Sequence, residues 1–142
     1  MKNIIIILIS TLLISSCTVN NTQKNISYKS ARKYFAKNTY DNKDFTEKIM
    51  SSQEEFERLF GAAVTMGTDG KPTPIDFSKE NVLALIYPKT NLEVKIIPVS
   101  LQENKQNTVY SYKVLEGAPN GFITIPNTII IIQEPNSKNN FS

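Results

Sequence analysis

Most of the chain after residue 80 carries hydrophobic patterns that are typical of β-strands. Nearly every position of the block NVLALIY is apolar, as in a strand buried on both faces. Two later blocks alternate apolar and polar positions on either side of a polar turn, which predicts a hairpin. Pro98 and Pro126 cannot donate a ladder hydrogen bond, so we expect a sheet edge or bulge at the first and a break at the second. The predicted strands span residues 45–50, 81–87, 92–102, 108–116 and 122–133, with turns at 103–107 and 117–121.

One segment has the period of an amphipathic helix. Phe56 and the apolar residues three and four positions later share one face. Within residues 51–55 a serine precedes a glutamate by three positions, which is the pattern of a capping box. Gly61 is a natural stop, although the helix could continue to Gly67. Residues 30–45 lead into the first predicted strand. We expect them to form a short helical or extended stretch that packs one aromatic side chain on the core.

These elements predict one α+β domain over residues 28–134, in which one main helix packs on a mostly antiparallel sheet of about five strands. The two-sided apolar strands at 82–87 and 129–132 belong at the centre of that sheet. Tyr110 and Tyr112 share one strand face. Two interpretations stay open for them: an exposed aromatic stripe for a partner or glycan, or a face packed beneath the helix.

The N-terminal residues have the pattern of a lipoprotein signal. Lys2 precedes an apolar run of about 11 residues, which is shorter than the roughly 20 that a membrane-spanning helix needs. ISSC then ends at Cys17, where a bacterial lipobox places its acylated cysteine. We therefore expect a signal peptide at residues 1–16 and a lipidated, flexible tether at 17–27. We expect a disordered tail at 135–142.

Composition narrows the chemistry of the domain. Lysine and arginine number 16 in the whole chain, of which Lys2 falls in the signal, so 15 basic residues face 13 acidic ones without any block of one sign. This balance gives no reason to expect a nucleic-acid partner. The chain has no histidine and its one cysteine is Cys17, which excludes Ser-His-Asp and Cys-His nucleophile systems. The usual zinc, copper and iron sites lack their ligands as well. A hard-cation site built from oxygens stays possible, but Asp41 and Asp44 miss the EF-hand spacing and Lys43 adds a competing charge, so we expect no metal and no cofactor.

The stretch GTDGKPTPIDFS, at 67–78, concentrates glycine, proline and charge. It fails as a phosphate-binding loop, because the glycine spacing is too short and a strand rather than a helix follows. We expect a rigid connector that could present a partner-binding loop. The residues of that candidate loop are Asp69, Gly70, Lys71, Pro72, Thr73 and Pro74.

The carboxylates close to this loop leave two interpretations. Asp76 is expected to be structural, accepting amide hydrogen bonds in the turn before the next strand. The alternative is a histidine-free hydrolase, in which Asp76 pairs with Glu80 or Asp69 across a cleft of about 5–9 Å. A third interpretation is a purely structural component of the envelope.

Three motifs carry a family resemblance. ARKYF-x-x-N, FERLFGAA-x-x-MG and GKPTPIDFSK, within residues 31–133, resemble a family of small Bacteroidota lipoproteins of unassigned activity. More distantly, the helix, DFSK and IP-x-x-I-I-I-I are similar to the C-terminal domain of PrcB-type accessory subunits of bacterial protease complexes. That domain usually has a Gly-Gly-Tyr stretch after its first strand, where this chain has Pro88–Leu92. Neither resemblance supplies a catalytic residue.

The sequence therefore predicts an envelope lipoprotein that binds rather than catalyses. Its expected contacts are membrane lipid, through acylated Cys17, and an envelope protein, for which a protease is one candidate. Residues 18–27 contain no acid, and surface-exposed lipoproteins of Bacteroidota often carry an acidic signal there. We therefore expect an outer-membrane anchor with the domain facing the periplasm. The pattern does not specify an oligomeric state.

Overall fold

The computed structural model describes residues 23–65, 67, 69–104 and 107–133, and these residues form a mostly β structure. Strands hold 57% of them and helix holds 7%. The predicted α+β class, with one main helix packed on a sheet of about five strands, is therefore wrong. The described elements are β1 (Lys24–Asn25), β2 (Tyr28–Ser30), β3 (Tyr34–Ala36), β4 (Thr46–Met50), α1 (Gln53–Leu59), β5 (Phe60–Ala62), β6 (Glu80–Ile86), β7 (Thr90–Glu103), β8 (Thr108–Thr124) and β9 (Asn127–Gln133).

A four-stranded antiparallel sheet in the order β2-β9-β6-β4 forms the centre of the described structure. β6 and β9 pair along their whole length, from Glu80 opposite Gln133 to Ile86 opposite Asn127. All seven residues of β6 are buried, because both faces of the sheet are covered. The prediction that the two-sided apolar strands lie centrally is confirmed.

β7 and β8 form a hairpin that is longer than predicted. β8 runs for 17 residues, and the predicted turn at 117–121 is wrong, because Pro119 still lies opposite Leu92 on β7. Two glycines and a proline fit within this strand because it ends its sheet and its register against β7 shifts on both sides of the Leu92–Pro119 pair. The bulge expected at Pro98 is confirmed, since the register shifts between Pro98 and Ser100.

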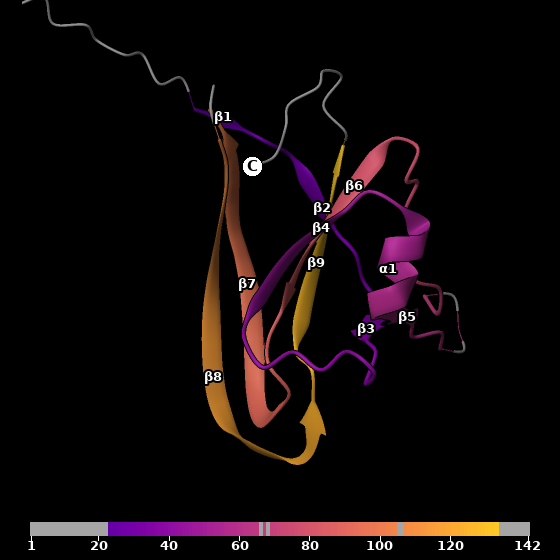
Figure 1. Cartoon of the computed structure of the whole chain (residues 1–142), viewed down its shortest axis with the longest axis vertical. Helices are drawn as coiled ribbons and strands as arrows, with labels where there is room; N and C mark the ends of the chain where they lie inside the picture. The colour runs from indigo at the N-terminus through magenta and orange to yellow at the C-terminus, as the bar shows by residue number, and fades with distance from the viewer. Residues whose placement is uncertain (1–22, 66, 68, 105–106, 134–142) are drawn as a thin grey trace, which may run out of the picture.

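The elements stack in three layers, which Figure 1 shows nearly edge-on. The hairpin of β7 and β8 covers one face of the central sheet, and α1 with the small β3–β5 sheet covers the other. β6 leads into the hairpin, and the hairpin returns to β9, the neighbour of β6. The chain therefore folds a long hairpin back over its own sheet.

Helix α1 begins as predicted but ends early. The Ser52 side chain accepts a hydrogen bond from the Glu55 N–H at 3.3 Å, and a Glu55 carboxylate oxygen accepts one from the Ser51 N–H at 3.3 Å. The expected stop at Gly61 or beyond is wrong, because Phe60 is extended (φ −119°, ψ 146°) and starts β5. Gly61 instead serves strand packing: a Cβ there would lie 2.6 Å from the ring of Phe35 on β3.

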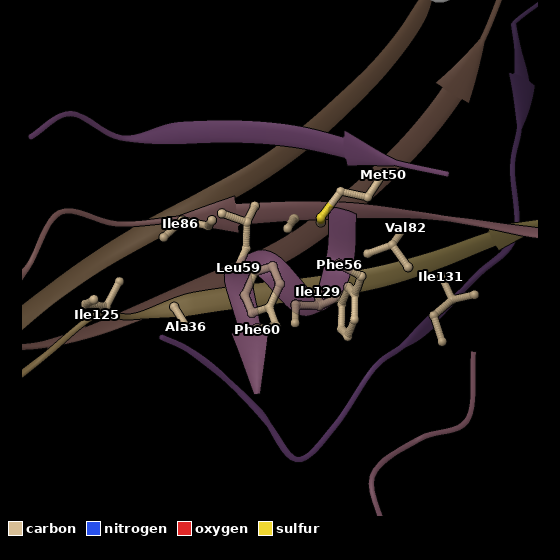
Figure 2. Packing of buried hydrophobic residues seen from close by; sticks show 11 residues of the cluster. Ala36, Met50, Phe56, Leu59, Phe60, Val82, Ile86, Ile125, Ile129 and Ile131 are labelled. Carbon is tan, nitrogen blue, oxygen red and sulfur yellow. The ribbon is translucent and has the colours of Figure 1, made fainter. Parts of the chain in front are cut away.

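Two hydrophobic clusters hold the layers together. The first lies between the central sheet and α1, and Figure 2 shows Phe56, Leu59 and Phe60 packed among side chains of β6 and β9. The second lies between the central sheet and the hairpin, with Leu101 almost fully buried in it. The isoleucines of β9 serve both clusters, since Ile129 and Ile131 face α1 while Ile130 and Ile132 face the hairpin. Alternate residues of one strand thus support both outer layers.

The end of the expected tether joins the fold. Lys24 and Asn25 pair with the last two residues of β7, and the Ile26 N–H donates to the Leu101 carbonyl oxygen at 2.8 Å. The proposed signal peptide at 1–16, the lipidation site Cys17 and the tail at 135–142 lie outside the described residues.

Candidate binding surface

The candidate loop at 69–74 lies between β5 and β6 and is fixed by backbone contacts. Gly70 is buried, and its carbonyl oxygen accepts a hydrogen bond from the Thr65 N–H at 3.0 Å. A Cβ at Gly70 would lie only 1.7 Å from the Thr65 carbonyl oxygen, so this close approach requires glycine. Asp69, Lys71 and Pro74 remain exposed.

Thr73 ties the same loop to the segment between β2 and β3. Its side-chain oxygen accepts from the Arg32 N–H at 2.9 Å, and its own N–H donates to the Arg32 carbonyl oxygen at 3.1 Å. The Tyr34 hydroxyl donates to the Thr73 carbonyl oxygen at 2.7 Å. Half-buried Pro72 precedes this anchor, so the loop is a rigid connector with three exposed side chains.

Asp76 organises the turn that begins β6. One carboxylate oxygen accepts from the Ser78 hydroxyl at 2.6 Å and from the Ser78 N–H at 3.1 Å. These bonds, and secondarily the charge of Lys79, lower the pKa of Asp76. The Asp76 carbonyl oxygen also accepts from the N–H groups of Lys79 and Glu80. The side chain therefore stabilises a turn and stays ionised at neutral pH.

Glu80 is a buried polar centre, which sequence reasoning considered only as a partner for Asp76. Its carboxylate accepts from the Asp76 N–H at 2.9 Å, from Gln133 Nε2 at 2.9 Å and from Lys29 Nζ at 3.3 Å. The hydrogen bond from the Asp76 N–H is the main reason that the pKa of Glu80 is lowered, and Lys29 adds to it. Glu80 thus joins β2, β6 and β9 at one end of the central sheet.

Tyr110 and Tyr112 on β8 are neither an exposed stripe nor a face packed beneath the helix, which were the two interpretations of the sequence. They face the central sheet on the side opposite α1, inside the second cluster. Tyr112 stacks on Phe45, and its hydroxyl donates to Glu47 at 2.6 Å, which raises the pKa of Tyr112 to about 12. Tyr110 contacts Tyr28 on β2, at the opposite edge of the central sheet. The hairpin therefore crosses the sheet at an angle.

The opposite face of the hairpin carries large aliphatic side chains that point to solvent. We call this the hairpin outer face, and its aliphatic members are Ile97, Val99, Val109 and Leu115, with 41%, 52%, 47% and 51% of their surfaces exposed. Ile97 lies opposite Lys113 and Leu115 lies opposite Lys95, so Ile97 and Leu115 are diagonal neighbours. Such neighbours are about 7–8 Å apart or less and can touch. Val99 follows Ile97 by two residues on β7, and Val109 lies farther along β8, opposite Gln102. The four aliphatics therefore lie along one face of the hairpin, and we call them the apolar stripe.

Lysine side chains flank this stripe. Lys95 forms an ion pair with Glu93 at 3.1 Å. Among the residues that the structure describes, the Lys113 side chain has no ion pair or hydrogen bond. The hairpin outer face therefore combines an apolar stripe with an uncompensated positive charge near its middle.

The alternation of β8 contains the signal for this surface, but it does not say which face is inside. Tyr110 and Tyr112 stand on one face and Val109 and Leu115 on the other, so both faces hold residues that favour burial. The packing of the hairpin on the central sheet buries the aromatic face. Only the tertiary structure therefore identifies the aliphatic face as exposed.

Other kinds of site have less support in the described part of the chain. No group of three or more aspartate, glutamate, histidine or cysteine side chains is placed to hold a metal ion there. No helix within the same residues is long and apolar enough to cross a bilayer. Comparisons of the chain with protein-family models, with curated proteins and with solved structures found no match.

Proposed function

We propose that this protein is a lipid-anchored lipoprotein of the bacterial envelope whose β domain binds a protein partner and catalyses no reaction. The observation that carries the binding role is the stripe of four half-exposed aliphatic side chains on the hairpin outer face. Exposed apolar side chains that share one face of an ordered surface cost solvation free energy and commonly mark a site of protein association. The anchor is acylated Cys17, in an outer membrane with the domain facing the periplasm.

The chemistry of the carboxylates favours binding over hydrolysis. A hydrolase with paired carboxylates needs one acid whose pKa is raised, so that it can donate a proton to the leaving group. Asp76 and Glu80 instead both have lowered pKa values, because hydrogen bonds stabilise their charged forms. Each is also committed to contacts within the turn before β6.

The resemblance to small Bacteroidota lipoproteins supports the envelope location, and the more distant likeness to protease-complex accessory subunits suggests the class of the partner. Two surfaces could receive it. The hairpin outer face is apolar and extends over two long strands, whereas the loop at 69–74 offers a rigid but mainly polar surface. We assign the partner to the hairpin outer face, because burial of aliphatic area is the larger source of binding free energy.

The test is cross-linking and affinity capture of the full lipidated chain from its own envelope. The first variant combines Ile97→Ser and Leu115→Ser, which removes apolar area from solvent-exposed positions. The second combines Lys71→Ser and Pro74→Ser in the loop as a matched control. We expect a partner that both the native chain and the loop variant capture and that the hairpin variant loses. A partner lost only with the loop variant would move the site to the loop, and capture unaffected by either variant would refute both assignments.

Two further substitutions test the rest of the proposal. Cys17→Ser should release the chain from the membrane fraction, and its retention there would contradict lipid anchoring. Asp76→Asn should leave partner capture unchanged, provided that the thermal midpoint shows a folded domain. An activity that Asp76→Asn abolishes while the fold survives would favour the hydrolase.

A further inference from the structure

We infer that the open edge of β8 accepts an extended, acidic segment of the protein partner as an added strand. This inference rests on the proposed function and specifies how the hairpin outer face is used. It commits to one recognition mode, in which main-chain hydrogen bonds give affinity and alternate side chains give specificity.

The first observation is that β8 ends its sheet. The order is β1-β7-β8, and within the described residues the backbone of β8 bonds to β7 alone. One row of its N–H and C=O groups is therefore available for pairing. β4 also ends a sheet, but it has five residues and exposes one large aliphatic side chain, Ile49.

The second observation defines the length of the edge. Residues 109–115 alternate regularly between exposed and half-buried positions, as in a straight strand. Beyond them, 116–119 are exposed without alternation, and the register against β7 shifts near Pro119. A pairing segment of about seven residues is close to the usual length of a strand.

The third observation is the pattern of side chains beside this edge. An added strand would place its outward residues next to Val109, Ser111, Lys113 and Leu115. Aliphatic residues at its two ends would extend the apolar stripe of the hairpin outer face. An acid near its middle would supply the negatively charged partner that Lys113 does not have among the described residues.

The same lysine disfavours a second copy of this chain as the occupant. In an antiparallel β8–β8 pair that overlaps over residues 109–115, the two Lys113 side chains would lie opposite or diagonal to each other. Like charges in these positions repel, and an edge lysine is a common device against self-pairing. The positive edge therefore selects an acidic partner.

The probe is a heptapeptide with valine at both ends, glutamate at the third position and threonine elsewhere. Fluorescence anisotropy at low salt should show saturable binding to the full chain. A peptide with lysine in place of glutamate should bind about threefold to tenfold more weakly, and added salt should reduce this ratio.

Variants of the chain separate charge recognition from background. Lys113→Glu should reverse the preference between the two peptides. Lys71→Glu, which makes the same change of charge in the loop at 69–74, should leave the preference unchanged. Circular dichroism and the thermal midpoint confirm that each variant is folded. An unchanged preference in folded Lys113→Glu would overturn the inference.

The main-chain contact has its own test. Two versions of the glutamate peptide carry N-methyl groups on alternate amides, one set along each edge of the peptide strand. We expect one version to bind and the other to fail, because an added strand bonds through one edge. Binding by both would show that side chains alone hold the peptide, and the inference would then be wrong.

These outcomes remain distinct from failure of the proposed function. If the peptides do not bind while partner capture still depends on Ile97 and Leu115, the binding role stands and strand addition falls. If capture depends on neither residue, the proposed function falls, and the peptide measurements still decide whether the edge accepts a strand.

Discussion

The hydroxyl group of Tyr110 should destabilise the fold that its ring helps to stabilise. The oxygen is buried and has no hydrogen-bond partner among the described residues, while the ring packs against Tyr28 and Tyr112. A hydroxyl buried without a bond costs about 1–3 kcal/mol in proteins. Tyr110→Phe removes the oxygen and keeps the ring, so we expect the free energy of unfolding to rise by about 0.5–2 kcal/mol.

Tyr112→Phe is the matched control, because it makes the same change two residues away on the same face. Its hydroxyl donates to the Glu47 carboxylate at 2.6 Å, and the substitution removes that bond. We therefore expect the opposite sign, a loss of about 0.5–1.5 kcal/mol. The chain has no tryptophan, so urea unfolding is best followed by far-ultraviolet circular dichroism, with linear extrapolation to water.

The dependence of the free energy of unfolding on pH in the alkaline range provides a second test of the same reasoning. Burial raises the pKa of Tyr110 well above its ordinary value, and the Glu47 hydrogen bond raises the pKa of Tyr112 to about 12. The unfolded chain therefore releases these protons first, and stability should fall as pH rises above about 10. Each tyrosine contributes a slope of at most about 1.4 kcal/mol per pH unit, and each phenylalanine variant should flatten this dependence.

The result that refutes this reasoning is a loss of stability in Tyr110→Phe with an unchanged denaturant slope. That result would mean that the Tyr110 hydroxyl makes a favourable bond in the folded protein. The packing of the hairpin on the central sheet would then differ from the one described.

Three further substitutions test the loop, the buried carboxylate and the helix. Gly70→Ala should lower the thermal midpoint by the equivalent of about 1–3 kcal/mol, because the new Cβ clashes with backbone, whereas Gly121→Ala has nothing within 4 Å of it and should not clash. Glu80→Gln should cost about 1–3 kcal/mol at neutral pH. Since the pKa of Glu80 is lowered in the fold, the native stabilisation is lost as pH falls below about 4.3, and urea titrations between pH 7 and pH 3 should show a flatter acid limb in the variant. Phe56→Ala should cost about 3–5 kcal/mol in the same unfolding assay, against less than about 0.5 kcal/mol for exposed Phe122→Ala.

Local chemistry was enough to predict several parts of the fold. The apolar blocks of β6 and β9 specify buried strands, because nearly every position needs to leave water whichever face it occupies. The capping box before α1 specifies where the helix begins, because the Ser52 hydroxyl accepts from the free Glu55 N–H and the Glu55 carboxylate accepts from the Ser51 N–H. The prolines at 98 and 126 mark a bulge and a strand break because neither can donate a hydrogen bond.

The size of the elements depended on contacts that are distant in sequence. Phe60 and Gly61 fit a helix by period, but pairing with β3 draws them into a strand directly after seven helical residues. Gly117 and Pro119 are typical of a turn, yet an edge strand tolerates both, so β8 continues past them. The predicted fold class was wrong for this reason, because propensity is weaker than tertiary pairing.

The amino-acid sequence by itself determined the central strands, the start of the helix and the exclusion of histidine- and thiol-based chemistry. Tertiary structure alone decided which face of β8 is buried. Alternation assigns residues to two faces but carries no label for the inner one, and both faces of this strand are apolar enough to pack. The tyrosines are buried because the hairpin packs this face on the central sheet, and that packing leaves Ile97, Val99, Val109 and Leu115 exposed on the other face.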